Sequence, residues 1–183
     1  ARIGPDSALY FTSLRGDVDG DDAVQDTTDY RARIFHTREK VGAWSDPTPL
    51  EIPNASMRDQ ANSTWSLDGH WFYFSQDDGN GIFSIWAMER DKPGSVPLKV
   101  VGDGSSTCTQ PMVARVNGVQ TLFFTKANTG DSSDMDIWSC TIDGTQTNDA
   151  KALGAPINTP GDETCPYFDS ASNTLWFSSD FLP

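Results

Sequence analysis

The sequence predicts an all-β fold, a β-propeller built of four-stranded antiparallel blades, chiefly because one aromatic-rich run is repeated. In each copy a large apolar residue precedes an aromatic residue, a Phe, and then Ser or Thr; the copies occupy 9–13, 72–76, 122–126 and 175–179. Such runs are typical of strands, because flat side chains pack well on a pleated surface. The shared Phe is residue 11, 74, 124 and 177, so it recurs after 63, 50 and 53 residues. A period of this size indicates repeated supersecondary units.

Three further observations favour this fold class. Asp68-Gly69 and Asn117-Gly118 each precede a copy of the aromatic run, and these dipeptides favour hairpin turns because both residues tolerate positive φ. No segment shows a sustained 3.6-residue hydrophobic period, so long helices are not expected. Because neighbouring blades cover both faces of a blade, its central strands are nearly continuously apolar, as the aromatic runs and the strands that follow them are here. A β-sandwich, in which buried and solvated positions alternate, is the second fold considered.

Each aromatic run is expected to be the second strand of a blade, with three other strands around it. A first strand precedes the later copies, at 62–65, 110–114 and 165–168. A third strand with an Ile-aromatic pair follows, at 33–36, 84–87 and 136–139. A short fourth strand completes the unit, at 48–51, 98–100 and 151–153. Pro49 and Pro97 suit an outer edge strand, where a missing amide donor costs little.

These strands divide the chain into blades at 1–52, 53–102 and 103–154, with a partial blade at 155–183. That is about three and a half blades, whereas closed propellers contain roughly four to eight. An open end would leave a sheet face and aromatic rings in water, which is unfavourable. We therefore expect the chain to be a fragment, or to complete a ring with another chain or with further residues.

Charge and hydropathy exclude two classes of partner. The formal net charge of the 183 residues is −13. Nucleic-acid binding needs clustered Lys and Arg to release counterions, and an anionic bilayer repels such a chain, so neither partner is expected. No run approaches the ~18 apolar residues of a membrane span.

Four segments carry further repeat motifs, namely 42–50, Asp136-Ile137-Trp138, 153–163 and 174–180. They resemble, in that order, the WSxPxxL stretch, the DIY strand, the INT-x-x-DE corner and the TLYFSSD strand in the repeat of TolB-type, WD-repeat-like β-propeller proteins of the bacterial cell envelope. The resemblance covers nearly the whole chain and implies a periplasmic or cell-surface location. Most such proteins are regarded as interaction scaffolds, and a minority of similar propellers are carbohydrate-active lyases or peptidases.

The connection after the first aromatic run contains the residues most typical of a metal site. Asp17, Asp19 and Asp21 occupy positions 1, 3 and 5 of a calcium-loop pattern, and Ca²⁺ prefers six to eight hard oxygen ligands. Position 6 is Asp22 rather than Gly, and position 12 is Thr28 rather than Glu. A solvated acidic loop is therefore the favoured interpretation, with calcium as the alternative. No other cofactor is expected.

Other acidic residues lie in loops that share one face of a propeller. They are Asp77, Asp78, Asp131, Asp134, Asp162 and Glu163. A strongly acidic face can steer a partner with a basic surface. The alternative is that these charges serve solubility alone.

The histidines and cysteines carry no recognisable catalytic motif. His36 and His70 have no Cys/His metal spacing around them, and no Gly-x-Ser-x-Gly nucleophile elbow occurs. Cys140 falls in a third strand, which predicts a buried free thiol. Cys108 and Cys165 both start first strands in successive blades, so a disulfide between them is a hypothesis; it requires Cα atoms within roughly 7 Å.

The sequence thus predicts a non-catalytic protein-interaction or structural module of an extracytoplasmic bacterial assembly, with no catalytic residues and with protein partners in a larger complex. The competing hypothesis is a carbohydrate-active or hydrolytic propeller enzyme with its carboxylates on acidic loops. A compact carboxylate pair, or a metal, at the mouth of the central channel would favour the enzyme.

Overall fold

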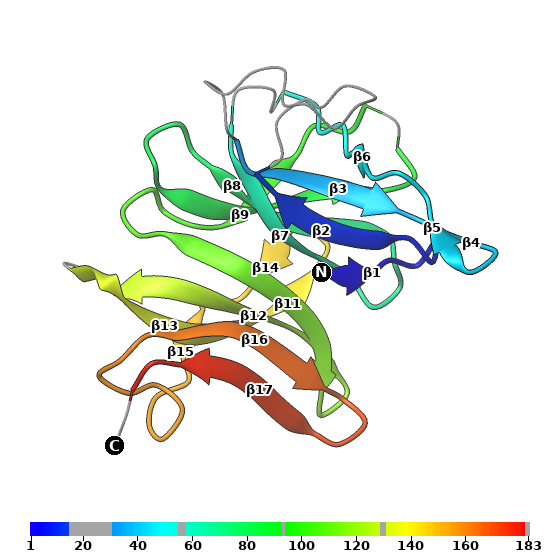
Figure 1. The fold of residues 1–183 in the computed structure, drawn as a ribbon. Coiled ribbons are helices and arrows are strands. Elements are labelled where there is room, and N and C mark those ends of the chain that lie inside the picture. The colour runs from blue at the N-terminus through cyan, green and yellow to red at the C-terminus, as the bar shows by residue number, and fades with distance from the viewer. Residues whose placement is uncertain (15–30, 55–57, 93, 129–130, 182–183) are drawn as a thin grey trace.

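The protein, described by a computed structural model, is built from successive antiparallel sheets (Figure 1). The structure describes residues 1–14, 31–54, 58–92, 94–128 and 131–181, with the backbone alone for 131–133. Every regular element within these ranges is a strand, which confirms the all-β prediction. The described ranges contain no helix of the length and apolarity needed to cross a membrane.

Four sheets follow one another along the chain. The first has the order β1 (Arg2–Ile3), β2 (Leu9–Ser13), β3 (Arg33–Thr37), β6 (Thr48–Pro49). The second contains β7 (Gln60–Trp65), β8 (Trp71–Asp77), β9 (Phe83–Glu89) and β10 (Leu98–Val101). The third contains β11 (Cys108–Val116), β12 (Val119–Asn128), β13 (Asp131–Asp143) and β14 (Gln146–Thr147), and β15 (Lys151–Ala152) also pairs with β13. The fourth has β16 (Glu163–Asp169) and β17 (Thr174–Ser179), while β4 (Glu39–Lys40) and β5 (Ala43–Trp44) form a separate hairpin.

All four predicted kinds of strand are present, and their order in the chain is their order across each sheet. The register repeats as well. The shared Phe of the aromatic run lies opposite an aromatic residue of the third strand, in the pairs Phe11–Phe35, Phe74–Trp86 and Phe124–Trp138. The β4–β5 hairpin and β14 were not predicted, because neither contains the apolar pattern by which strands are recognised.

The sheets pack face to face through their side chains. Phe72 and Phe74 of β8 belong to a cluster with residues of the first sheet, whereas Tyr73 between them packs with residues of the third. All three side chains are fully buried. The second sheet therefore has a neighbour on each face, which explains why the aromatic run in β8 is continuously apolar.

The first strand of each sheet (β1, β7, β11 and β16) is called here its inner strand, and each inner strand after β1 has a β-bulge with a residue at positive φ. These residues are Asn62 (φ 47°), Gln110 (φ 55°) and Cys165 (φ 55°). The amide of Asn62 donates to Thr12 Oγ1 at 2.8 Å, and that of Gln110 donates to Ser75 Oγ at 3.1 Å. Thr12 and Ser75 are the hydroxyl residues of the aromatic run. The hydroxyl at this repeated position therefore joins the first sheet to the second and the second to the third by a hydrogen bond.

The contact between the third and fourth sheets uses a side-chain amide as well as a hydroxyl. Thr125, the hydroxyl residue of the third aromatic run, donates to Gln110 Oε1 at 2.8 Å. The same oxygen accepts the amide of Cys165 at 2.7 Å. Gln110 thus connects the third and fourth sheets. At the corresponding place, the first and second sheets, and the second and third, are joined by a hydroxyl group alone.

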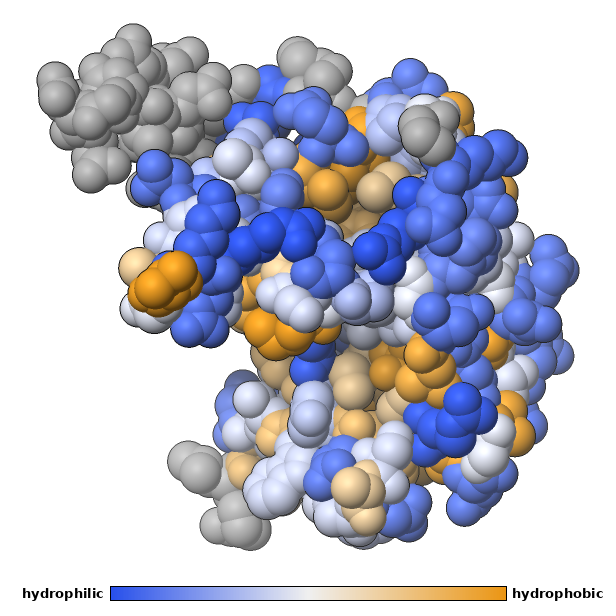
Figure 2. All heavy atoms as spheres, turned by 90° about the vertical axis from the view of Figure 1, so that its right-hand side faces the viewer, coloured by the Kyte–Doolittle hydropathy of each residue, from blue (hydrophilic) through white to orange (hydrophobic). Residues whose placement is uncertain are grey.

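The fourth sheet differs from the other three because, among the described residues, aromatic side chains of its strands are exposed. Trp176 is 62% exposed, Tyr167 is 45% exposed and Phe177 is 38% exposed. Viewed from the right-hand side of Figure 1, the surface is hollowed between an upper part that holds the first sheet and a lower part that holds the fourth (Figure 2). Hydrophobic atoms are visible in this hollow.

Candidate functional site

The acidic residues of the second sheet that were assigned to an interaction face hold their own loops together. Asp77 Oδ1 accepts the amide of Gly81 at 2.8 Å and so closes the β8–β9 turn. Asp78 Oδ2 lies 2.7 Å from Lys99 Nζ, and the exposed fractions of the two side chains are 13% and 36%. Both carboxylates therefore have partners inside the sheet.

The acidic residues between the third and fourth sheets are engaged in the same way. Asp134 Oδ2 accepts from Asn128 Nδ2 at 2.8 Å. Asp162 Oδ1 accepts the amide of Met135 at 2.8 Å, which ties the start of the fourth sheet to the third. Asp131 begins β13, and its side chain lies outside the described residues. Recognition of a basic partner by this face stays a prediction.

Asp136 is a further carboxylate beside this cluster. Asn128 Nδ2 donates to it at 3.1 Å as well as to Asp134. Burial, together with the charges of Asp134 and Glu163, raises the pKa of Asp136, although the hydrogen bond from Asn128 opposes the shift.

The assignment of Glu163 to an exposed acidic face is wrong, because its side chain is fully buried. Three donors surround its carboxylate: the amide of Thr159 at 2.7 Å, the hydroxyl of Thr159 at 2.6 Å and the hydroxyl of Ser179 at 2.7 Å. Burial alone would raise the pKa of Glu163, but these hydrogen bonds outweigh it and hold the pKa below its usual value. Glu163 is therefore a structural carboxylate that joins β16, β17 and the preceding loop.

The predicted calcium ligands Asp17, Asp19 and Asp21 lie outside the described residues. Within the ranges that are described, no group of three or more His, Cys, Asp or Glu side chains is arranged to hold a metal ion. Calcium binding by the acidic loop stays a prediction.

The predicted disulfide between Cys108 and Cys165 is wrong, since both thiols are free. The register of the inner strands gives the reason. Cys108 lies opposite Lys126 and Glu163 lies opposite Ser179, so Cys108 corresponds to Glu163. Cys165 is two residues further along, at the bulge, where its side chain is exposed while that of Cys108 is buried.

The three thiols are expected to differ in reactivity. Cys140 is free and buried, as predicted, and burial raises the pKa of both Cys108 and Cys140 to about 11. Because the thiolate is the reactive species, a maleimide at neutral pH should label only Cys165 in the folded protein and all three thiols in denaturant. Intact-mass spectrometry without reductant measures this. A folded protein that takes up no label would contradict the free, exposed state of Cys165.

Both histidines contact residues of their own sheet. His36 Nε2 lies 3.1 Å from Thr48 Oγ1, and its ring stacks on Tyr10 with centroids 5.8 Å apart. His70 Nδ1 lies 3.3 Å from Asp91 Oδ2. Each histidine thus has a polar partner within reach of a ring nitrogen.

The inner strands of all four sheets converge on one pocket of about 270 Å³. The bulge residues Asn62, Gln110 and Cys165 all line it, so the repeat directs corresponding positions to a common place. Arg2 crosses the pocket: its guanidinium donates to the carbonyl of Pro166 at 3.4 Å and lies 4.9 Å from the ring centroid of Tyr167. No carboxylate lines this inner-strand pocket among the described residues.

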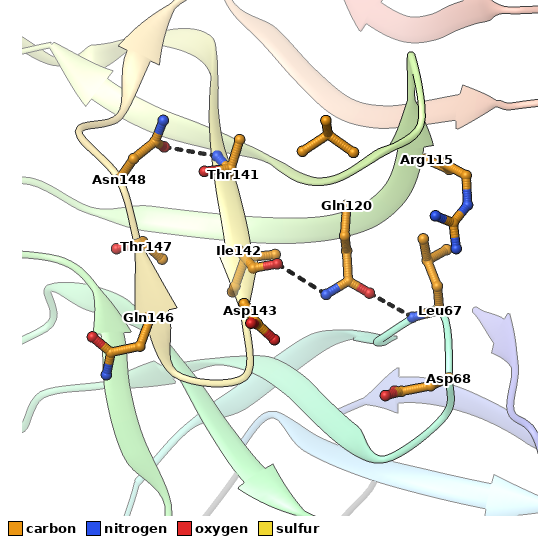
Figure 3. Close-up of a pocket in the computed structure, with 11 residues that line it drawn as sticks. Leu67, Asp68, Arg115, Gln120, Thr141, Ile142, Asp143, Gln146, Thr147 and Asn148 are labelled. Carbon is orange, nitrogen blue, oxygen red and sulfur yellow. Dashed lines mark hydrogen bonds between the residues drawn. The ribbon is translucent and has the colours of Figure 1, made fainter.

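A larger groove of about 630 Å³ lies between the second and third sheets, and it is named here the inter-sheet groove (Figure 3). Its lining residues are Leu67, Asp68, Arg115, Val119, Gln120, Thr141, Ile142, Asp143, Gln146, Thr147 and Asn148. One wall is the turn between β7 and β8, and the other is the β13–β14 hairpin with the turn that precedes β12.

Gln120 connects the two walls of the inter-sheet groove (Figure 3). Its Oε1 accepts the amide of Leu67 at 2.8 Å, and its Nε2 donates to the carbonyl of Ile142 at 3.0 Å. Asn148 Oδ1 accepts the amide of Thr141 at 2.7 Å, which closes the β13–β14 hairpin. The groove is therefore held in shape by hydrogen bonds on both sides.

The charges and apolar groups of the inter-sheet groove are accessible. Asp68 and Asp143 are both exposed and extend into the same part of the groove (Figure 3). Hydrogen bonds from Ser66 and from the amide of His70 hold the pKa of Asp68 below its usual value, so it is ionised at neutral pH. Leu67 is 41% exposed and Val119 is 50% exposed. Arg115 adds one positive charge to the lining, and its guanidinium donates to the carbonyl of Gly118 at 3.2 Å. The two carboxylates outnumber this cation, so the arrangement can bind a cationic group beside Asp68 and Asp143, between apolar contacts.

Sequence reasoning did not find the inter-sheet groove. The Asp68-Gly69 turn was recognised as a hairpin signal, but it gave no indication that a hairpin of the next sheet lies beside it.

No protein-family model matches the chain, and no curated protein matches it.

Proposed function

We propose that the chain forms a β-propeller segment that acts as a non-catalytic protein-interaction or structural module of an extracytoplasmic bacterial assembly. The successive sheets with one strand order, one register and face-to-face packing support the propeller architecture. The similarity of residues 153–163 and 174–180 to the TolB-type repeat supports a periplasmic or cell-surface location.

The inter-sheet groove is the observation that carries the interaction role. Its rim combines exposed Leu67 and Val119 with the carboxylates of Asp68 and Asp143. Apolar contacts supply affinity at protein interfaces, while charges select the partner and speed its association. A partner loop with a Lys or Arg flanked by apolar residues fits this chemistry.

The competing hydrolytic function has less support from the described residues. Glycoside hydrolysis needs two carboxyl groups, one of which must have a raised pKa to act as the acid. The pKa of Asp68 in the inter-sheet groove is lowered instead. The pKa of Asp136 is raised, but Asp136 lines neither the inter-sheet groove nor the inner-strand pocket. The inner-strand pocket, where an enzyme of this architecture is expected to place its carboxylates, is lined by amide, guanidinium, hydroxyl and thiol groups.

Site-specific photo-crosslinking in the source cells tests the interaction role. A photoreactive residue at Val119, on the groove rim, should give a discrete adduct with a protein, whereas one at Leu98 on the outer strand β10 should not. The double variant D68K/D143K should reduce the adduct at Val119 at least about fivefold, because it repels a basic partner. Equal adducts at the two positions, or an adduct unaffected by the charge reversal, would contradict the proposal.

A further inference from the structure

The sequence contains two Asn-Gly dipeptides, and the structure gives them different hydrogen bonds. They are Asn80-Gly81, between β8 and β9, and Asn117-Gly118, between β11 and β12. All four residues are exposed. An asparagine followed by glycine is open to spontaneous deamidation, because the glycine nitrogen that attacks the side-chain amide has no Cβ beside it to hinder the approach. Sequence and exposure are therefore alike at the two sites, and the hydrogen bonds around them differ.

The turn between β8 and β9 holds both reacting groups of its Asn-Gly pair. The amide of Gly81 donates to Asp77 Oδ1 at 2.8 Å, and Asn80 Oδ1 accepts the amide of Ile82 at 3.1 Å. Both hydrogen bonds oppose the rotation that would bring Asn80 Cγ onto the nitrogen of Gly81. The carboxylate of Asp77 also disfavours loss of the Gly81 amide proton, because a nearby negative charge disfavours a second one.

The turn between β11 and β12 leaves both reacting groups unoccupied. Within the described part of the chain, no hydrogen bond involves the side chain of Asn117 or the amide of Gly118. The guanidinium of Arg115 donates to the carbonyl of Gly118 at 3.2 Å, so the charge beside this turn is positive. A positive charge favours the deprotonated amide that attacks the side chain. Hydrogen bonding and charge thus both make Asn117 the more reactive of the two asparagines.

We propose that Asn117 is a site of spontaneous deamidation in the folded protein, whereas the fold protects Asn80. The amide of Gly118 loses its proton to hydroxide, and its nitrogen bonds to Asn117 Cγ. The bond from Cγ to the side-chain nitrogen then breaks, and this nitrogen takes a proton from water and leaves as ammonia. Water opens the resulting cyclic imide at either of its two C–N bonds, which gives aspartate or isoaspartate. This inference does not depend on the function proposed for the inter-sheet groove.

The modification changes one wall of the inter-sheet groove. The turn joins Val116 to Val119, which pair across the hairpin, and Val119 lines the groove. Isoaspartate routes the main chain through its Cβ atom, and a two-residue hairpin turn of fixed register does not accommodate the extra carbon. Either product also adds a carboxylate close to Arg115, another lining residue. The shape and the charge of the rim therefore both change at this turn.

Peptide mass spectrometry of the incubated protein tests the proposal. The folded protein is kept in mildly alkaline buffer and then digested, and each deamidation raises the mass of a peptide by about 1 Da. Fragmentation by electron transfer distinguishes isoaspartate from aspartate. The rate at Asn117 should exceed that at Asn80 at least about fivefold, because a hydrogen bond that must be broken is worth about 1 kcal/mol. The rate at Asn117 should rise in proportion to the hydroxide concentration.

Two controls separate the effect of the fold from that of the sequence. In denaturant the two asparagines should react at closely similar rates, because both are followed by glycine. Asp77→Ala removes the acceptor of the Gly81 amide, so the rate at Asn80 should rise about fivefold while the rate at Asn117 stays the same. The urea transition of this variant shows whether it remains folded.

Three results would overturn the proposal. The first is an equal rate at the two asparagines in the folded protein. The second is a reaction at Asn117 that appears only in denaturant, because the hairpin would then protect this residue. Neither result needs a variant, so both hold even where Asp77→Ala unfolds. The third is an unchanged rate at Asn80 in folded Asp77→Ala, which would show that the hydrogen bond to Asp77 is not what protects it.

Discussion

Replacement of Phe124 by Ala is expected to lower the free energy of unfolding by about 4 kcal/mol. Phe124 is fully buried between the second and third sheets, in a cluster that includes Tyr73, Ile85 and Cys140. Truncation removes a whole ring from this cluster and leaves a cavity that a sheet-on-sheet interface closes only in part, because both backbones are held by their own hydrogen bonds.

The matched control is Phe177→Ala, which makes the same substitution at the same repeat position. Because Phe177 is 38% exposed, its loss should cost only about 1 kcal/mol. Urea denaturation followed by tryptophan fluorescence measures both values, and the slope of the transition shows whether unfolding stays cooperative. Similar losses in the two variants would contradict the difference in packing between the third and fourth sheets.

The strands could be predicted because their signal is local and repeated. The aromatic run and the Ile-aromatic pair each indicate a β-strand within about five residues, and their repetition shows that the pattern is not a coincidence. Antiparallel order follows from the short turns between them, since neighbouring strands joined by a hairpin pair with each other. These signals led to the observed strand order and to the edge position of Pro49.

The errors at Cys165 and Glu163 share one physical cause. The strands begin at Cys108 and Glu163, two residues before the predicted starts at 110 and 165, so these two residues are buried strand residues that precede the bulge, whereas Cys165 lies at it. The bulge carries no glycine: Asn62, Gln110 and Cys165 adopt positive φ although they have Cβ atoms. The sequence therefore contained no ordinary signal for it.

The inter-sheet groove was beyond prediction for a different reason. Its walls belong to different sheets, and their separation depends on how one sheet packs on the next rather than on any local pattern. Gln120, which joins Leu67 to Ile142, looks like an ordinary polar residue at the start of an aromatic run. A long-range side-chain bridge of this kind becomes visible only in three dimensions.

Glu163→Gln is expected to destabilise the protein by about 2 kcal/mol at pH 7, because the carboxylate accepts three hydrogen bonds in a buried position. Glutamine has nearly the same shape but offers one accepting oxygen and a donating NH₂ group. One donor from Thr159 or Ser179 would then face another donor. Denaturation by urea at pH 7 measures the loss. Glu51→Gln makes the same substitution at an exposed position and is a control expected to change stability by less than about 0.5 kcal/mol.

The contribution of Glu163 should also depend on pH in one direction. Its pKa in the folded protein lies below the usual value near 4.5, so its ionised form stabilises the fold above that value. As the pH falls through the folded pKa, the carboxylate is protonated and this contribution disappears, whereas the glutamine side chain of the variant does not titrate. The stability difference between the unmodified protein and E163Q should therefore be constant from about pH 7 to 5 and should narrow below pH 4.5. A difference that remains unchanged down to about pH 3 would show that the hydrogen bonds to the charged form are not what Glu163 contributes.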